Sequence, residues 1–287
     1  QNDDPAAINA YTEAVTLLQT LRRDLIASDP DLQFSFRQQI EPIYRELVSL
    51  LVSPQDPPQA NLKQAREVIE SLQLAELENF FRSACLDVQP RQIDDVDAKA
   101  AVVYPIILPD KLAVVLSLPD ASFQIYQTDV SSQEVQKKIE ELLAAFNPLI
   151  SDQRRLDVSE EMYTWLIRPA EAVLAKQQIQ TLVFVLDGGL RNIPMAALYD
   201  GEKYLIETYQ VAITPGLQLL ASQQLAPENI EVLVGGLTEA RQGFDALPGV
   251  AIEANQIASN TSSQVYLDQN FTESNLQTQI GQTGFPI

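Results

Sequence analysis

The chain has 287 residues, of which 46% are hydrophobic, and this is enough apolar material to bury the core of one large or two smaller compact units. It carries 39 acidic and 19 basic residues, for a net charge of -20, and its lysines and arginines cluster at most in pairs. A chain with this charge is on average repelled by nucleic acid and by anionic membranes, so neither is expected as a partner.

Residues 5 to about 90 are predicted to be helical, because apolar residues recur there at three- and four-residue spacing. Two helices, at 8–26 and 34–52, are followed by a long helix that starts at residue 61. The sequences ASDPD and SPQDPPQAN separate them. Helix pairs of this length build tetratricopeptide-type arrays, so residues 1–90 are interpreted as a helical module that ends such an array, although a single pair is no repeat.

From residue 91 the pattern changes to short strands and helices. Three runs, AVVYPIIL, KLAVVLSL and SFQIYQT, are joined by short turns and predict an antiparallel meander. A helix over 131–147 follows, with Ser131 or Ser132 as its N-cap. A second helix over 157–177 should be kinked or divided at Pro169.

The remaining chain alternates strand and helix. TLVFVLD (181–187) and IEVLVGG (230–236) are continuous apolar runs of the kind found in strands buried on both faces. A helix that starts near Pro248 and Gly249, the strand QVYLD, a helix capped by Thr272 and a last strand that starts at GFPI follow. We therefore predict an α/β fold, with a helical module followed by a mainly parallel sheet, flanking helices and a small antiparallel meander.

The loop after residue 186 holds the candidate site residues, because ligands of open parallel sheets bind beyond the carboxyl ends of the strands. Asp187 ends the strand, Gly188 and Gly189 allow a tight turn, and Arg191 supplies a fixed positive charge. An alternative is an ordinary strand-to-helix connection. In that case Asp187 caps backbone amides, and Arg191 pairs with Asp187 or with a surface carboxylate.

Several chemistries have no support in the sequence. The chain contains no histidine, and the loop VLVGGLTEARQG has neither the lysine of a phosphate-binding loop nor the spacing of a dinucleotide fingerprint. No cofactor is expected, and no metal either, because calcium-binding loop spacing is absent. Cys85, the only cysteine, ends an apolar helix and is interpreted as a small buried hydrophobe rather than a nucleophile.

A lone cysteine and the lack of an apolar run of about 20 residues favour a cytoplasmic location. An exported form stays open, because the sequence begins at Gln1 and a targeting signal could precede it.

Five segments taken in order, SLQLAELENFFRSACLD, WLIRPAEA, LVFVLDGGLRNIPMAALYDG, YLIETYQVAITPGLQLL and ALPGVAIEANQI, resemble the CHAT domain. This caspase-like domain occurs with tetratricopeptide repeats and is especially common in cyanobacteria, so a cyanobacterial source is expected. The resemblance runs from about residue 60 to the end, and it makes residues 91–287 the N-terminal portion of such a domain. It implies a caspase- or separase-like architecture and a cysteine peptidase, in which a histidine takes the thiol proton and the thiolate attacks a peptide carbonyl.

Neither catalytic motif of that family is present in these residues, so we expect the chain to be truncated before the histidine and cysteine, with a sheet incomplete at one edge, and to be inactive alone. The resemblance places Asp187, Gly188, Gly189 and Arg191 in the substrate groove. The expected partners are a protein or peptide substrate and a regulatory protein bound through the helical module. Two alternatives remain: a non-catalytic interaction scaffold, and a small-molecule-binding α/β domain that uses the loops at residues 187 and 235.

Overall fold

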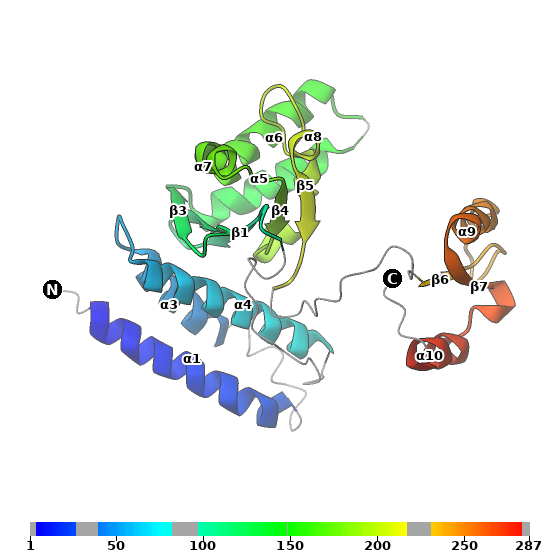
Figure 1. Cartoon of the computed structure of the whole chain (residues 1–287), viewed down its shortest axis with the longest axis horizontal. Helices are drawn as coiled ribbons and strands as arrows, with labels where there is room; N and C mark the ends of the chain where they lie inside the picture. The colour runs from blue at the N-terminus through cyan, green and yellow to red at the C-terminus, as the bar shows by residue number, and fades with distance from the viewer. Residues whose placement is uncertain (1–3, 27–39, 82–96, 148, 217–230, 283–287) are drawn as a thin grey trace. The chain divides into compact units, whose positions relative to one another are not determined.

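A computed structural model describes residues 4–26, 40–81, 97–147, 149–216 and 231–282. The chain divides into two compact units, residues 1–221 and 222–287 (Figure 1). The predicted boundary near residue 90, Cys85 and the strand expected at GFPI lie outside the described residues, so the two-module division and the incomplete sheet edge stay predictions. No helix among the described residues is long and apolar enough to cross a membrane.

Three helices begin the first unit: α1 (Asp4–Ile26), α3 (Glu41–Val52) and α4 (Gln59–Phe81). Their positions agree with the predicted helices over the described residues. Pro42 lies in the first turn of α3, where its missing N–H has no helical partner to lose. The first half of the predicted apolar face of α4 is confirmed, because Leu62, Ala65, Ile69 and Leu72 are buried. Its second half was predicted to comprise Leu77, Phe80, Phe81 and Ala84; Leu77 is only partly buried, and the side chains of the other three lie outside the described residues.

The first unit contains a five-stranded sheet in the order β3-β2-β1-β4-β5. Its strands are β1 (Ala100–Ile107), β2 (Leu112–Ser117), β3 (Phe123–Thr128), β4 (Thr181–Phe184) and β5 (Gln210–Ile213). The pairs β1/β2 and β2/β3 are antiparallel, which confirms the predicted meander. The pairs β1/β4 and β4/β5 are parallel. No sequence pattern predicts β5, because it has only four residues and most of them are exposed.

Helices α5 (Ser132–Ala145), α6 (Asp152–Leu166) and α7 (Glu171–Lys176) follow the meander. Ser131 is the N-cap of α5, as predicted: its Oγ accepts a hydrogen bond from the N–H of Glu134, whose carboxylate accepts one from the N–H of Ser131. Pro169 divides the next helix as predicted, since a 3₁₀ turn separates α6 from α7. Helix α6 begins five residues earlier than its predicted start at residue 157, because Ser151 caps it.

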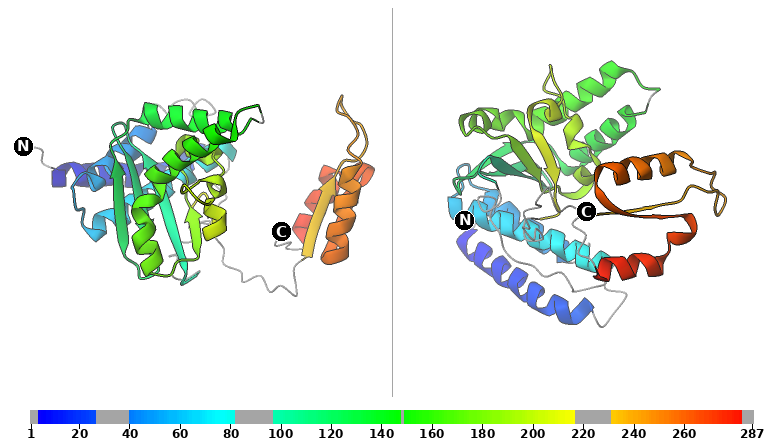
Figure 2. Two further views of the ribbon diagram at one scale, coloured as in Figure 1. Left: turned by 90° about the horizontal axis from the view of Figure 1, so that it is seen from above. Right: turned by 45° about the vertical axis from the view of Figure 1, so that its right-hand side comes forward.

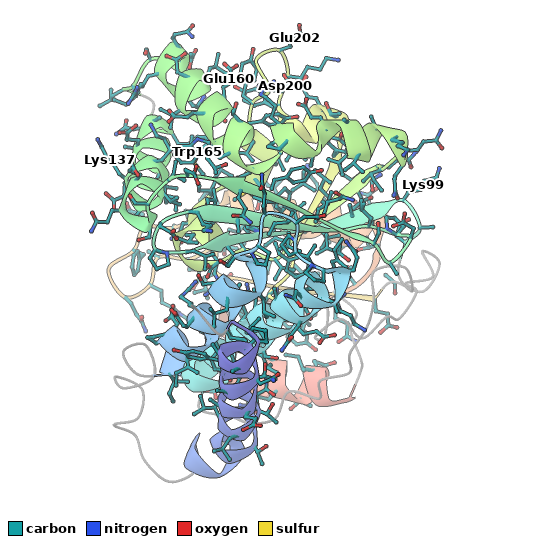
Figure 3. All side chains as sticks on the ribbon, turned by 90° about the vertical axis from the view of Figure 1, so that its left-hand side faces the viewer. Lys99, Lys137, Glu160, Trp165, Asp200 and Glu202 are labelled. Carbon is teal, nitrogen blue, oxygen red and sulfur yellow. The ribbon has the colours of Figure 1, made fainter. Side chains whose placement is uncertain are left out.

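The sheet is the middle layer of three (Figure 2). Alternate residues of its strands point to opposite faces and join two separate cores. Val102, Tyr104 and Ile106 of β1 pack against α3 and α4, whereas Ala101 and Val103 face α5, α6 and α7. Trp165 on α6, labelled in Figure 3, packs against the second core. The predicted burial of the β4 region on both faces is confirmed.

The second unit is a strand–helix–strand arrangement with an additional helix. Its elements are β6 (Glu231–Gly236), α9 (Gly249–Asn260), β7 (Ser262–Leu267) and α10 (Glu273–Gln282), and β6 pairs with β7 in parallel. Thr272 caps α10 as predicted, because its Oγ1 accepts a hydrogen bond from the N–H of Asn275 at 3.2 Å. Strand β6 is partly exposed rather than buried on both faces, because α9 is the described helix of this unit that packs most closely on β6 and β7, and one helix covers only one face of a sheet.

Candidate functional site at the end of strand β4

The predicted loop begins where β4 leaves the sheet. After Asp187 the chain turns into a 3₁₀ helix over Gly188–Asn192. Gly188 has a φ of +51°, a left-handed conformation that glycine adopts without steric cost. Gly189 lies against α5, where an added Cβ would stand 2.8 Å from Oε1 of Gln136. The two glycines therefore serve the turn and its packing on α5.

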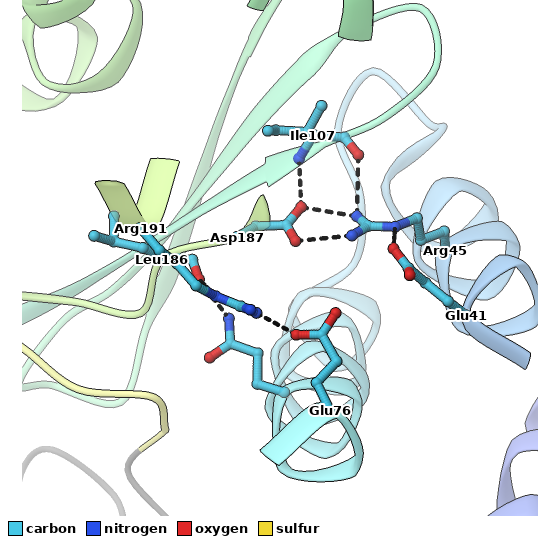
Figure 4. A network of polar contacts seen from close by, with 8 residues as sticks. Glu41, Arg45, Glu76, Ile107, Leu186, Asp187 and Arg191 are labelled. Atoms are coloured by element: carbon cyan, nitrogen blue, oxygen red, sulfur yellow. Dashed lines mark hydrogen bonds and ion pairs between the residues drawn. The ribbon is translucent and has the colours of Figure 1, made fainter. Parts of the chain in front are cut away.

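Asp187 is only 2% exposed and accepts three hydrogen bonds (Figure 4). Arg45 donates two of them, from Nη1 to Oδ2 at 2.8 Å and from Nη2 to Oδ1 at 2.9 Å. The third comes from the backbone N–H of Ile107, at 2.9 Å. Asp187 does accept a backbone amide, but that amide belongs to β1 and not to the 3₁₀ helix that follows Asp187.

The N–H of Ile107 needs this acceptor because the β1/β4 ladder ends early. Val185 donates to the carbonyl of Val103 at 3.0 Å, so the odd-numbered residues of β1 face β4. The next such residue is Pro105, which has no N–H, and the paired register stops at Val103 and Phe184. The Asp187 side chain then replaces a backbone carbonyl as the acceptor for Ile107.

Arg45 connects three segments of the chain. Besides its two hydrogen bonds to Asp187, Arg45 donates from Nη1 to the carbonyl of Ile107 at 3.2 Å and from Nε to Glu41 at 2.7 Å. Burial by itself would lower the pKa of Arg45, but the hydrogen bonds and negative charges of Asp187 and Glu41 outweigh it and raise this pKa above its ordinary value. The guanidinium therefore stays charged at any pH at which the protein is folded.

Helix α4 holds the other side of the loop. Gln73, a buried residue, donates from Nε2 to the carbonyl of Leu186 at 3.1 Å, and Arg191 donates from Nε to the same carbonyl at 3.0 Å. Arg191 also forms an ion pair with Glu76 of α4. Its partner is thus a carboxylate, as the alternative interpretation expects, and not Asp187.

This arrangement connects α3, α4, β1 and the loop after β4 through hydrogen bonds and ion pairs. Both oxygens of the Asp187 carboxylate already accept hydrogen bonds from Arg45, and one also accepts from Ile107, so the carboxylate is engaged in structural contacts. The side chains that these hydrogen bonds join include no thiol, hydroxyl or imidazole group. Among the described residues, no group of three or more His, Cys, Asp or Glu side chains is arranged to hold a metal ion.

The loop at residue 235, the second candidate loop with glycines, lies in the second unit. Side chains of that unit fill the space beside Gly235 and Gly236. A Cβ at Gly235 would overlap the ring of Phe271, and one at Gly236 would lie 2.6 Å from Cγ1 of Val250. Asp268 accepts hydrogen bonds from the N–H and the hydroxyl of Thr238, both at 2.6 Å. These glycines permit close packing of the unit around β6.

Sequence reasoning missed Arg45, Glu41, Gln73 and Glu76, which lie more than 100 residues before the loop. One signal was present for Arg45: it lies on α3 beside Tyr44, Leu47 and Val48, which are buried. A charged residue next to such an apolar face requires a partner. The identity of that partner could not be deduced from local spacing.

Fold and loop define a three-layer α/β unit with its candidate site at the carboxyl end of a parallel strand, followed by a strand–helix–strand unit. Residues 156–287 match the model of the CHAT domain family. The match begins within α6 and includes β4, the loop with Asp187 and Arg191, and the second unit. Arg45 and Glu76 lie outside it. A search of curated proteins found no match to this chain.

Proposed function

We propose that these residues form part of a CHAT-family, caspase-like cysteine peptidase that acts on a protein or peptide substrate. The observation that carries the proposal is the family match over residues 156–287, which includes the loop at the carboxyl end of β4. In open parallel sheets this edge is where ligands bind. The residues Asp187, Gly188, Gly189 and Arg191 are proposed to line one wall of the substrate groove.

The peptidase chemistry requires a cysteine thiolate and a histidine that accepts its proton. The 287 residues contain one cysteine and no histidine, so they cannot form this pair among themselves. The proposal therefore assigns them the scaffold and the groove wall, and it expects no peptide cleavage by these residues alone. Within the loop, Arg191 is the charged side chain that a substrate can reach, because it is 43% exposed even while it is paired with Glu76.

The test compares the 287-residue chain with the complete product of the gene that encodes it. Both are incubated with a peptide library, and cleavage is read by mass spectrometry with and without a thiol alkylating agent. We expect cleavage that alkylation abolishes in the gene product and none in the chain. A gene product that contains no histidine, or that cleaves peptides equally well after alkylation, would contradict the proposal.

The groove assignment has its own test in the active gene product. Arg191→Ala should change the residue preferred next to the cleaved bond, because it removes the exposed charge of the wall. Arg155→Ala is the matched control, since Arg155 pairs with Asp152 on α6. An unchanged cleavage preference in Arg191→Ala would remove Arg191 from the groove.

A non-catalytic interaction scaffold is the second candidate function. It is favoured by a specific observation: both charged side chains of the loop already have partners on α3 and α4 of the same chain. In this case the helices, including a tetratricopeptide-type array, bind a partner protein, and the α/β units support them. The cleavage assay separates the two functions, because the scaffold predicts no thiol-dependent cleavage in the gene product.

A further inference from the structure

A three-way polar junction joins α3, β1 and the loop after β4. Arg45 of α3 contacts Glu41 on its own helix, the carbonyl of Ile107 and both carboxylate oxygens of Asp187 (Figure 4). Ile107 closes the triangle by donating its N–H to Asp187. The side chain of Asp187 is 2% exposed and that of Arg45 is 21% exposed, so solvent screens the contact only weakly.

We propose that Arg45 is a positioning residue for the groove wall, which sets the conformation of the loop at residues 187–191 from a helix outside the CHAT-matched segment. The inference rests on the proposed function only in taking the loop as a wall of the substrate groove; the positioning of the loop by Arg45 is independent of that function. Helices α3 and α4 are therefore part of the loop's supporting structure.

The shape of the guanidinium group carries the argument. Its planar fork points four hydrogen bonds in fixed directions: Nε to Glu41, Nη1 to Asp187 and Ile107, and Nη2 to Asp187. An ammonium group is a single charged point and cannot reproduce this geometry. Lysine at position 45 would keep the charge but lose the angular control over Asp187.

The contacts from α4 have a different character. The ion pair between Arg191 and Glu76 is more exposed, with 43% and 21% of the two side chains accessible. Exposed pairs contribute little net stability, because water competes for both charges. The paired hydrogen bonds from Arg45 to Asp187 thus hold the loop more firmly than the ion pair does. In the Arg191–Glu76 pair, the carboxylate of a bound peptide can take the place of Glu76.

The experiment is hydrogen–deuterium exchange of the 287-residue chain, read for peptides that cover residues 186–193. The N–H groups of Leu190 and Ile193 report the 3₁₀ turn, since they donate to the carbonyls of Asp187 and Leu190. We expect Arg45→Lys to speed exchange of this segment about tenfold, the effect of losing one charge-assisted hydrogen bond, while β2 and α5 keep their protection. Glu41→Gln, which weakens the orientation of Arg45, should produce a smaller change in the same peptides.

Arg155→Lys is the matched control, because Arg155 forms an ion pair with Asp152, whose side chain is 83% exposed. Unchanged exchange of residues 186–193 in Arg45→Lys would overturn the proposal. So would an equal loss of protection throughout the first unit, since that pattern means a general structural role.

The cleavage assay separates this inference from the proposed function. In an active gene product, Arg45→Lys should lower kcat/KM by about tenfold at a temperature at which the variant is fully folded. Local exchange that changes without any effect on cleavage would overturn the assignment of the loop to the groove wall, and it would leave Arg45 established as the residue that positions the loop. A gene product without peptidase activity would contradict the proposed function alone, because the exchange result would still establish that Arg45 positions the loop.

Discussion

Tyr104 of β1 donates a 2.6 Å hydrogen bond to the carboxylate of Glu70 on α4, and both side chains are buried between the sheet and that helix. Burial, followed by the charge and hydrogen bond of Glu70, raises the pKa of Tyr104 well above its ordinary value. The hydroxyl therefore remains a donor at every pH of interest. Two elements far apart in sequence are joined here by a polar contact within an apolar core.

Tyr104→Phe keeps the ring and removes this donor from a buried carboxylate. We expect it to lower the free energy of unfolding of the first unit by about 1–3 kcal/mol. Chemical denaturation followed by fluorescence measures this, because Trp165, the only tryptophan, lies in that unit. Tyr126→Phe on β3 is the control, since Tyr126 is only partly buried. Equal effects of the two variants would contradict the importance of the Glu70 contact.

The Asp187 carboxylate should be one of the most sensitive positions of the first unit. Asp187→Ala removes the acceptor of the Ile107 N–H and two of the hydrogen bonds of Arg45, which keeps Glu41 and the carbonyl of Ile107. We expect a loss of about 1–3 kcal/mol, because a buried donor is left unpaired. Asp152→Ala removes a carboxylate with the same 2.8 Å arginine contact at an exposed position, and should cost about 1 kcal/mol or less. Chemical denaturation followed by Trp165 fluorescence measures the free energy of unfolding of both variants. Similar losses would show that burial does not determine how much the Asp187 contacts contribute to stability.

Two glycines of the second unit should respond in opposite ways to alanine. Gly235→Ala places a methyl group in the ring of Phe271, so we expect a cost of about 1–3 kcal/mol from overpacking. Gly249→Ala meets no atom within 4 Å and begins α9, where alanine is the better helix former. Hydrogen exchange of β7 should accelerate in the first variant and be unchanged or slower in the second. The packing argument fails if the two variants behave alike.

Asp268 should make the second unit sensitive to acid. Hydrogen bonds from the hydroxyl and N–H of Thr238, and then from the N–H of Glu239, hold the pKa of this carboxyl below its usual range. A folded-state pKa below the unfolded value contributes stability that is present above the unfolded pKa of about 3.9 and is lost as the pH falls through the folded value.

We therefore expect hydrogen-exchange protection of β7, after correction for the intrinsic pH dependence, to fall in this acidic window more steeply in the native chain than in Asp268→Asn. The asparagine keeps an acceptor and tolerates the positive φ of this position. Asp245→Asn, which changes an exposed carboxyl of the same unit, should leave the native profile intact. Parallel profiles for all three proteins would exclude Asp268 as the origin of the acid sensitivity.

Local sequence patterns were sufficient to predict most of the helices and strands. Three- and four-residue spacing predicted α4, alternation and turns predicted the meander, Ser131 and Thr272 were recognisable caps, and Pro169 divided a helix as expected. These features depend on hydrogen bonds and side-chain periodicity within one stretch of chain, so neighbouring residues contain the information. The α/β class followed from the order of the elements.

Only the tertiary structure decided how the loop after β4 is held. Strand β5 is too short and too exposed to leave a periodic signal, and it forms because β4 offers it a parallel edge. Arg45 reaches Asp187 across 142 positions of sequence, at a place where Pro105 interrupts the ladder and leaves an N–H to be paired. Long-range contacts of this kind depend on how helices and sheet pack, and no local spacing encodes them. From the residues alone, Asp187 and Arg191 could be identified as charged groups at the end of a strand, whereas their partners were determined by the packing of α3 and α4 on the sheet.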